Sequence, residues 1–399
     1  MKILVITYYF SPSSIIGAKR WTDFYNLSRT DKDLDLTILT SNPKGDKLLK
    51  EKVNYIGKEH TFNGSNSLQT KAYSLSLIRH PSLYIRSLDR SVFSHWIKEC
   101  KRWINLNNQK EYDLIISSYG PIASLIVGNY AKKVLKTPLV FDLRDLISIQ
   151  GQKKSLPIIH QIDKIIDRFI TRKVDKFLTV SPTCYSKAKT FYNQDVALIY
   201  NGYTNGLNLK NNDLSIKNKQ ELKILYMGTL GNNRNPLKIV NILNEYAKRY
   251  PSVKISISFA SNDNPFDFLM ESNYSKLKII RLGYLTKKEL AFEKEKNNIF
   301  LLLEDQRSKG DENLTGKIYE YFEEEKPILV SCSQTSDIGK VIKATRTGSI
   351  VNSIDEMELF IQSKIIRDNH ECLKYSRSNQ YVKLKKALGS LVTNQNKIN

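Results

Sequence analysis

One loop-to-helix junction in the second half of the chain carries the residue types that bind phosphates and sugars. The sequence there runs from Gly310 through Thr315, Gly316 and Lys317 to Glu320. A Thr-Gly turn at a helix start presents backbone N–H groups that can hold a phosphate, and Lys317 adds a fixed positive charge. One helical turn further on, the Glu320 carboxylate can accept paired hydrogen bonds from vicinal hydroxyls, as on a ribose. The junction therefore predicts either a nucleotide site or a capping turn before a helix whose acidic residues are solvated.

Motifs for several other chemistries are missing from the sequence. It contains no G-x-G-x-x-G after the first apolar run, no Walker loop and no G-x-S-x-G elbow. Its five histidines, at positions 60, 80, 95, 160 and 370, have no metal-ligand spacing. Its four cysteines include no C-x-x-C pair, which favours reduced thiols in a cytosol. We therefore expect no metal and no cofactor other than a substrate nucleotide.

The 310–320 junction belongs to a pattern of alternating strands and helices that recurs along the whole chain. With 399 residues, 41% of them hydrophobic, the chain is long enough for two domains with real cores. Short runs of Ile, Leu and Val alternate with helical patterns of about ten or more residues, which indicates parallel sheets covered on both faces. The predicted strands are 2–8, 34–40, 114–117, 139–142, 176–180 and 197–200, then 223–227, 254–259, 279–282, 299–303, 327–330 and 349–351.

A composition shift divides this α/β pattern into two doubly wound, Rossmann-like domains. Residues 201–220 are rich in Asn, Lys, Gly and Asp and read as a linker. We expect an N-terminal domain over 1–203 and a C-terminal, nucleotide-binding domain over 204–370. A polar helix and tail over 371–399 should pack back toward the first domain. Two such domains would face a central cleft, where folds of this class bind ligands.

The charge balance favours a polyanionic partner. Lys and Arg number 62 against 40 acidic residues, a net charge of +22 that is concentrated in the first half. In the segment 71–110, basic residues interleave with Leu, Tyr, Trp96 and Trp103, which suits an anionic membrane surface. Two core-packed helices with a solvated basic face are the alternative. No nucleic-acid recognition motif accompanies the charge, so nucleic acid is not the expected partner.

The order of several motifs resembles the retaining glycosyltransferases of the GT-B fold, particularly glycosyltransferase family 4 and its capsule and O-antigen members. Glu312 and Glu320 match the family's Glu-x7-Glu region. The other matching stretches are Tyr8–Pro12 with Ile16–Trp21, Tyr112–Pro121, Phe141–Asp145, Ile199–Tyr203 and Tyr226–Gly231. Each stretch is short, but together they follow the family's order over most of the chain.

This resemblance implies roles for particular residues. Glu320 would bind the ribose of a nucleotide sugar, which is expected to be a UDP- or GDP-linked donor. Glu312 would approach the transferred sugar. Arg234 and Lys317 would hold the diphosphate beside Thr315 and Gly316. Gly17 would close over the diphosphate from the first domain, and Lys238 is a further donor-binding candidate.

The chain departs from the family where many members place a histidine that faces the sugar. Asp142, Arg144 and Asp145 occupy the comparable region here and are the candidate catalytic residues with Glu312.

The sequence thus predicts a metal-independent glycosyltransferase of cell-surface polysaccharide biosynthesis. Its partners would be a nucleotide sugar, a lipid-linked or oligosaccharide acceptor, and the inner face of the cell membrane, with the protein peripheral and cytoplasmic. A non-catalytic protein of the same fold and a sugar-nucleotide epimerase of the GT-B type are the alternatives.

Overall fold

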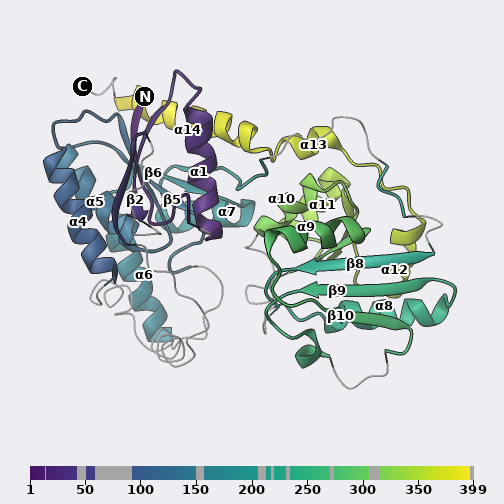
Figure 1. Ribbon diagram of the computed structural model, residues 1–399. Coiled ribbons are helices and arrows are strands. Elements are labelled where there is room, and N and C mark those ends of the chain that lie inside the picture. Colours follow the sequence, from purple (N-terminus) through teal and green to yellow (C-terminus); the bar gives the residue numbers. More distant parts are fainter. Residues whose placement is uncertain are drawn as a thin grey trace. The chain divides into compact units, whose positions relative to one another are not determined.

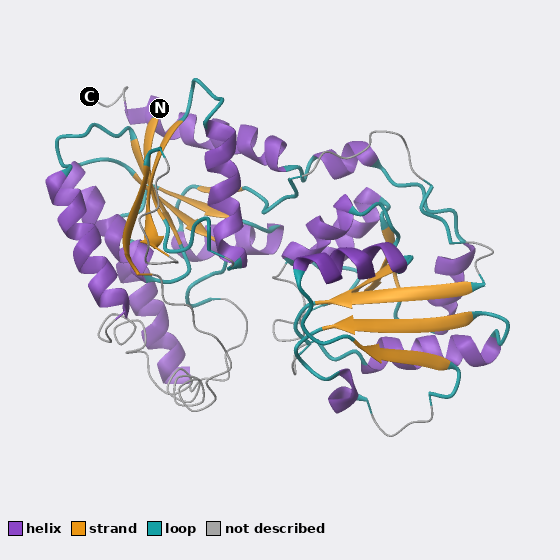
Figure 2. Ribbon diagram, viewed as in Figure 1, coloured by secondary structure: helices purple, strands orange, loops and turns teal. Residues whose placement is uncertain are grey.

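The chain forms two α/β units. The computed structural model describes residues 1–13, 15–42, 51–58, 92–149, 157–204, 213–216, 220–230, 234–269, 274–304 and 314–395. Unit 1 comprises residues 1–200 together with 380–399, and unit 2 comprises residues 201–379. Figure 1 shows the order of the elements along the chain, and Figure 2 separates helices from strands. Each unit is described separately below.

Unit 1 is built on a parallel sheet whose strands are runs of Ile, Leu, Val and Phe. The strand order is β3-β2-β1-β4-β5-β6-β7. Their bounds are β1 Lys2–Ile6, β2 Asp35–Asn42, β3 Val53–Lys58, β4 Leu114–Ser118, β5 Leu139–Leu143, β6 Lys176–Thr179 and β7 Val196–Leu198. Strands β1, β4 and β5 are buried on both faces apart from the first residue of β1, as expected for a sheet with helices on either side.

Helices cover both faces of this sheet (Figure 2). On one face, α4 (Val92–Leu106), α5 (Ala123–Leu135) and α7 (Pro182–Tyr192) share a core with the strands, and α6 (Pro157–Thr171) packs beside them through Ile170. On the other face, α1 (Ile16–Ser28) contributes Trp21 and Phe24 to a second core.

Helix α14 (Arg377–Gln395) completes the second face of unit 1 although it lies at the far end of the sequence. Tyr381, Leu384 and Leu388 join the core that α1 forms on the sheet. The Lys385 ammonium lies 2.7 Å from a carboxylate oxygen of Asp31. That hydrogen bond is the main reason why the pKa of Asp31 is lowered. The last helix is therefore part of the core of unit 1.

Unit 2 repeats the arrangement with a six-stranded parallel sheet in the order β10-β9-β8-β11-β12-β13. The strands are β8 Glu221–Met227, β9 Lys254–Ala260, β10 Leu277–Arg281, β11 Ile299–Leu303, β12 Ile328–Ser331 and β13 Gly348–Ile350. The helices are α8 Leu237–Arg249, α9 Lys287–Lys296, α10 Gly316–Glu323, α11 Asp337–Thr345, α12 Ile354–Gln362 and α13 Asn369–Leu373, with a 3₁₀ turn at Pro265–Phe268.

The structure confirms two parallel, Rossmann-like sheets and departs from the sequence analysis in three elements. β3 was not predicted, because a short edge strand with Asn54 and Lys58 lacks a clear apolar run. The predicted linker is in part core, since Leu214 and Ile216 are buried in unit 2. The predicted last helix is two helices, because α13 ends at Leu373 and Ser376 pairs with Tyr203 before α14 begins.

The two tryptophans of the segment 71–110 pack in or against the core of unit 1. Trp96 is 1% exposed and packs against Tyr8, while Trp103 is partly buried beneath the Lys110 ammonium, 5.4 Å from the ring centroid. The interpretation of both as membrane anchors is therefore wrong for Trp96, and the core-packed alternative holds for α4. Residues 71–91 lie outside the described part of the chain.

We predict that Leu388→Ala destabilises unit 1 selectively. Leu388 is fully buried between α14 and the sheet of unit 1. Removing a buried leucine side chain costs about 2–5 kcal/mol of unfolding free energy. Hydrogen exchange should show faster exchange in β1 and α1, with exchange in β8 unchanged. Val382→Ala, at an exposed position of the same helix, is the control and should leave both units as they are. Equal loosening of both units by Leu388→Ala would contradict the assignment.

Candidate functional site

Several of the predicted site residues follow strands at or next to the point where the strand order of each sheet reverses direction. In unit 1, β2 and β3 are added on one side of β1, and β4 to β7 are added on its other side, so the reversal lies between β1 and β4. In unit 2 the same reversal lies between β8 and β11. The carboxyl ends of the two strands at such a point leave a crevice in which open α/β sheets bind ligands. Gly17 follows β1, Arg144 and Asp145 follow β5, and Lys317 follows β11.

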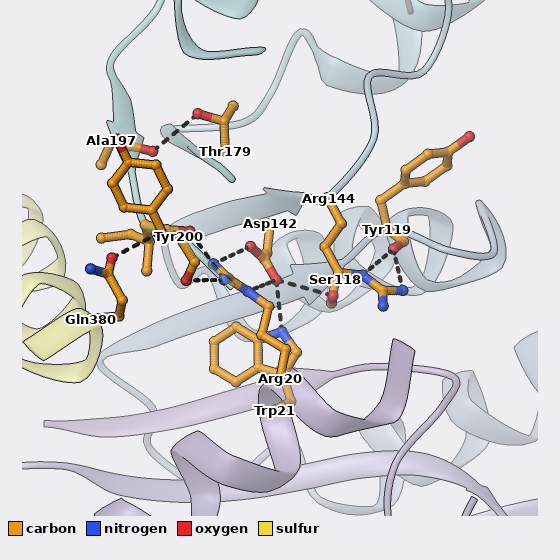
Figure 3. Close-up of polar contacts among 11 residues, drawn as sticks. Arg20, Trp21, Ser118, Tyr119, Asp142, Arg144, Thr179, Ala197, Tyr200 and Gln380 are labelled. Atoms are coloured by element: carbon orange, nitrogen blue, oxygen red, sulfur yellow. Dashed lines mark hydrogen bonds and ion pairs between the residues drawn. The ribbon is translucent and has the colours of Figure 1, made fainter. Parts of the chain in front are cut away.

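A buried ion pair lies at the carboxyl edge of unit 1 (Figure 3). Asp142, on β5, is fully buried, and Arg20, on α1, is 2% exposed. The guanidinium meets the carboxylate through two hydrogen bonds, Nε to Oδ2 at 3.1 Å and Nη2 to Oδ1 at 3.0 Å. Trp21 Nε1 and Ser118 Oγ also donate to Oδ2, at 2.8 and 3.2 Å. Four donors thus saturate Asp142, and the burial favours a positioning role over contact with a substrate.

Arg20 also binds the backbone where the segment 1–200 of unit 1 ends. Its Nη1 donates to the backbone oxygens of Ile199 at 3.1 Å and Tyr200 at 3.0 Å. The Tyr200 N–H in turn donates to Gln380 Oε1 at 2.8 Å. Arg20 therefore joins α1, β5 and the point at which the chain leaves unit 1 for unit 2, as Figure 3 shows. Removing one partner of such a pair typically costs about 3–5 kcal/mol, because the other charge stays buried.

Arg144 lies between two glycines at this edge. Its Nε and Nη2 donate to the Tyr119 backbone oxygen at 3.3 and 3.0 Å. A Cβ added at Gly17 would come within 2.4 Å of Arg144 Nη1, and one added at Gly120 within 2.8 Å of Nη2. Gly120 also has φ +107°, which favours glycine. Neither position can take a side chain unless the guanidinium moves.

This packing places a cation beside the first turn of α1. Gly17 is the second residue of that helix, whose first N–H groups have no partner inside the helix. Burial lowers the pKa of the Arg144 guanidinium, and the negative charges of Asp142 and Asp145 oppose this shift. The helix start and the guanidinium together can hold an anion. Asp145 itself is exposed, so of the two predicted carboxylates it is the one that solvent and ligands reach.

The edge of unit 2 offers a second helix start with a cation. Thr315 caps α10, its Oγ1 accepting the Lys317 N–H at 3.4 Å, and Gly316 is exposed with open space around its Cα. The Lys317 side chain reaches toward the end of β8, since its Cε would lie 3.5 Å from a Cβ at Gly228. Gly228 has φ +123°, so glycine is favoured at the turn where β8 ends.

Glu320 lies one turn into α10, next to Lys317. Its Oε2 is 3.2 Å from Lys317 Nζ, and its side chain is 40% exposed. The carboxylate thus holds the ammonium at the switch point while a second oxygen stays available to hydroxyl groups. The structure brings Thr315, Gly316, Lys317 and Glu320 together as the sequence predicts. Glu312 lies outside the described residues.

Arg234 and Lys238 occupy different places on the path from β8 into α8. Arg234 lies on the loop, its N–H bonded to the Leu230 backbone oxygen at 3.2 Å, with a half-buried side chain. Lys238 lies in the first turn of α8, where its ammonium donates to Asn352 Oδ1 at 2.9 Å. That bond directs Lys238 toward the end of β13, the strand at the sheet's outer edge. Arg234 is therefore the better placed of the two for the switch point.

Two residues important to these edges had no role in the sequence analysis. Arg20 is 122 positions from Asp142, and no local pattern reveals that pairing. Gly228 could have been found, because it directly follows a predicted strand and precedes the loop to a helix.

Three further observations concern the described residues as a whole. Over the described ranges, no cluster of three His, Cys, Asp or Glu side chains has a geometry that could hold a metal ion. The helices described there include none that is both long and apolar enough to cross a membrane. All four cysteines are free and buried.

The chain is similar in fold to several solved structures. It superimposes on an apo lipopolysaccharide outer core galactosyltransferase, WaaB, with TM-score 0.60, 13% identity and coverage of 98% of this chain and 99% of that one. Anabaena HepE in complex with UDP gives TM-score 0.53, 13% identity and coverage of 98% and 100%. The UDP-GlcNAc 2-epimerase of Methanocaldococcus jannaschii gives TM-score 0.50 and 12% identity, with coverage of 98% of this chain and 100% of that one. No protein-family model and no curated protein matches the sequence. These likenesses establish the GT-B fold.

We predict that Gly17→Ala acts through Arg144. The added methyl group would overlap Nη1, so the guanidinium must leave its place between the glycines. Binding of inorganic pyrophosphate, measured by calorimetry, should weaken by about tenfold, the loss of one charge-assisted contact. In an Arg144→Ala background the same glycine substitution should add little, because the two residues form one unit. If the losses of pyrophosphate affinity add up in the double variant, Gly17 acts independently of Arg144 and the prediction is wrong. Gly389→Ala, at an open position of α14, is the control.

Proposed function

We propose that the protein is a glycosyltransferase that takes its sugar from a nucleotide-sugar donor. The observation that carries this proposal is the switch point of unit 2, where Gly228, the Thr315-capped start of α10, Lys317 and Glu320 meet. A helix start with a cation suits a diphosphate, and a carboxylate one turn further suits ribose hydroxyls. The similar HepE structures contain UDP or UDP-glucose, which supports a UDP-linked donor over a GDP-linked one.

The chemistry in this proposal is cleavage of the bond between a sugar and a diphosphate. Negative charge develops on the leaving oxygen, and preorganised positive groups lower the barrier most. Lys317, Arg234 and the α10 N-terminus would supply that charge without a metal. As in family 4, transfer would occur with retention, the leaving phosphate helping to deprotonate the acceptor on the same face of the sugar.

The carboxyl edge of unit 1 carries further proposed site residues. Gly17 and Arg144 are proposed to bind phosphate there, and Asp145 and Glu312 are the carboxylates proposed to act on the transferred sugar or the acceptor. Asp142 would act indirectly, by holding Arg20 and the strand end that bears Arg144. We further propose that the acceptor is a lipid-linked or oligosaccharide intermediate of cell-surface polysaccharide synthesis, such as capsule or O-antigen, at the inner face of the cell membrane.

A sugar-nucleotide epimerase is the second candidate. The epimerase of M. jannaschii matches nearly the whole chain, as the glycosyltransferases do. An epimerase would convert the donor without an acceptor, whereas a transferase would release UDP only as the sugar is transferred. Analysis of the products formed from UDP-sugars, with and without an oligosaccharide acceptor, distinguishes the two.

We predict that Glu320→Gln weakens donor binding and leaves the fold intact. A hydrogen bond to a charged group contributes about 1.5–3 kcal/mol, so the dissociation constant for UDP-glucose should rise by about ten- to a hundredfold. Glu320 is 40% exposed, so the thermal midpoint should change little. Glu324→Gln, at the opposite end of α10, is the matched control. Calorimetry that finds equal affinity for UDP-glucose in wild type and Glu320→Gln would remove the ribose role.

Sugar transfer should continue in the presence of excess chelator. In this proposal, Lys317 and Arg234 neutralise the leaving diphosphate, and a divalent ion is not needed for that purpose. The measurement is release of UDP from a UDP-sugar in the presence of an oligosaccharide acceptor, before and after EDTA treatment. Loss of transfer with EDTA, restored by magnesium or manganese, would show that a metal carries the charge instead.

A further inference from the structure

Helix α6 buries two carboxylates and exposes a line of large apolar side chains. Asp163 and Asp167 are buried, at 7% and 0% exposure, whereas Ile158, Ile165 and Phe169 are 63–70% exposed. Ile162, at 39%, lies between them. The positions 158, 162, 165 and 169 follow the spacing of a single helical stripe. Four of the eleven large apolar side chains that are exposed in the described part of the chain therefore form one line, which we call the α6 stripe.

Hydrogen bonds fix the rotation that keeps the α6 stripe outside. Asp167 Oδ2 accepts from the Ser148 N–H at 3.0 Å, from Ser148 Oγ at 2.7 Å and from the Tyr192 hydroxyl at 3.2 Å. Asn129 Nδ2 donates to the Ile170 backbone oxygen at 2.8 Å. Turning the stripe inward would carry a bonded carboxylate out of its buried place. The exposure of the stripe is thus built into the packing of α6.

Within α6 and the turn that follows it, the described charged side chains that reach solvent on the α6 surface are mainly positive. Both carboxylates of α6 point inward, and the solvent-exposed charged side chains at and just after its C-terminal half are Arg168, Arg172 and Lys173, with Lys164 half-exposed. The Arg172 guanidinium lies 4.3 Å from the Phe169 ring centroid, so a cation borders the stripe directly. Neither α5 nor α7 contains an acidic residue. Asp175, which follows the helix, is paired with Lys132.

Charge complementarity selects one occupant for this surface. A second copy of the chain in a twofold dimer would bring the same cations face to face, where like charges repel. An apolar stripe bordered by Arg and Lys instead matches a bilayer, whose acyl region takes the apolar side chains while anionic head groups attract the cations. Long Arg and Lys side chains can reach the head groups while their stems stay beside the stripe.

We propose that α6 is a docking helix that lies on the surface of an anionic lipid bilayer. Ile158, Ile162, Ile165 and Phe169 would enter the interface, and Lys164, Arg168, Arg172 and Lys173 would pair with lipid phosphates. This places the membrane contact on a helix different from the segment 71–110. It deepens the proposed function and rests on it for the acceptor, but docking itself requires no donor and is measured without one.

Vesicle flotation tests the proposal directly. The full chain should float with vesicles of phosphatidylcholine and phosphatidylglycerol and remain unbound with phosphatidylcholine alone. Combining Ile158→Ser, Ile165→Ser and Phe169→Ser should lower the partition coefficient by about tenfold or more, since the apolar contribution is lost. Replacing Lys164, Arg172 and Lys173 by Gln should reduce binding at low salt most, because screening weakens the wild-type attraction at high salt. Wild-type flotation by both variants would overturn the proposal.

Matched controls separate docking from general stickiness and from misfolding. Tyr284→Ser, Phe292→Ser and Leu359→Ser remove three exposed apolar side chains from unit 2 and should float like wild type. UDP-glucose binding in lipid-free solution should be equal in wild type and the α6 variants. Equal donor affinity with lost flotation supports docking, whereas absent donor affinity in wild type with intact flotation refutes the proposed function alone.

A second readout does not depend on loss of binding. Ile165→Trp should show a blue shift of tryptophan emission on adding anionic vesicles, and brominated lipids should quench it. Phe292→Trp should show neither effect. A wild-type dimer in lipid-free solution that the α6 serine variants convert to monomer would assign the stripe to a second copy and overturn the proposal.

Discussion

The buried pair of Arg20 and Asp142 is the constraint on which the edge of unit 1 depends. Charges so deeply buried are tolerated only when hydrogen bonds satisfy them, and here the partners come from far apart in the sequence. Trp21 and Ser118 donate further hydrogen bonds to the Asp142 carboxylate. The Ile199 and Tyr200 backbone oxygens accept hydrogen bonds from the Arg20 guanidinium. The loops after β1, β4 and β5 consequently hold one arrangement. Arg144 and its two glycines occupy the space that this arrangement leaves.

Charge of the same sign appears at both candidate edges, but the two are built differently. In unit 1 the Arg144 guanidinium lies against the backbone of Gly17 and Gly120, in space that a side chain at either position would fill, and it donates to the Tyr119 backbone oxygen. In unit 2 the cation is held by a partly exposed carboxylate, Glu320, across one helical turn. Exposed pairs of this kind contribute little stability, so a ligand can compete for either partner at small cost. The first edge is preorganised, and the second can rearrange around what it binds.

Most of the fold could be predicted because its strands are buried on both faces. Runs such as Ile299–Leu303, which alternate with helical patterns, predict strands buried on both faces, and every predicted strand is present. β3 was missed because an edge strand needs no such run. The last helix was predicted to pack toward the first domain, and in the structure Tyr381, Leu384 and Leu388 join the core of unit 1. For the site, the Thr315–Glu320 junction was visible since its parts are neighbours in sequence. The Arg20–Asp142 pair was not, because it exists only once α1 and β5 are packed.

The return of the chain to unit 1 through α14 affects the order in which the molecule is assembled. The chain crosses between units at Tyr200 and again at Gln380, and Tyr203 pairs with Ser376 just beyond. During synthesis, nearly all of unit 2 is therefore made before the helix that closes the second face of unit 1. Until then the core that contains Trp21 and Phe24 lacks Tyr381, Leu384 and Leu388. The growing chain therefore holds an incomplete core in unit 1 until α14 has been made and can pack on it.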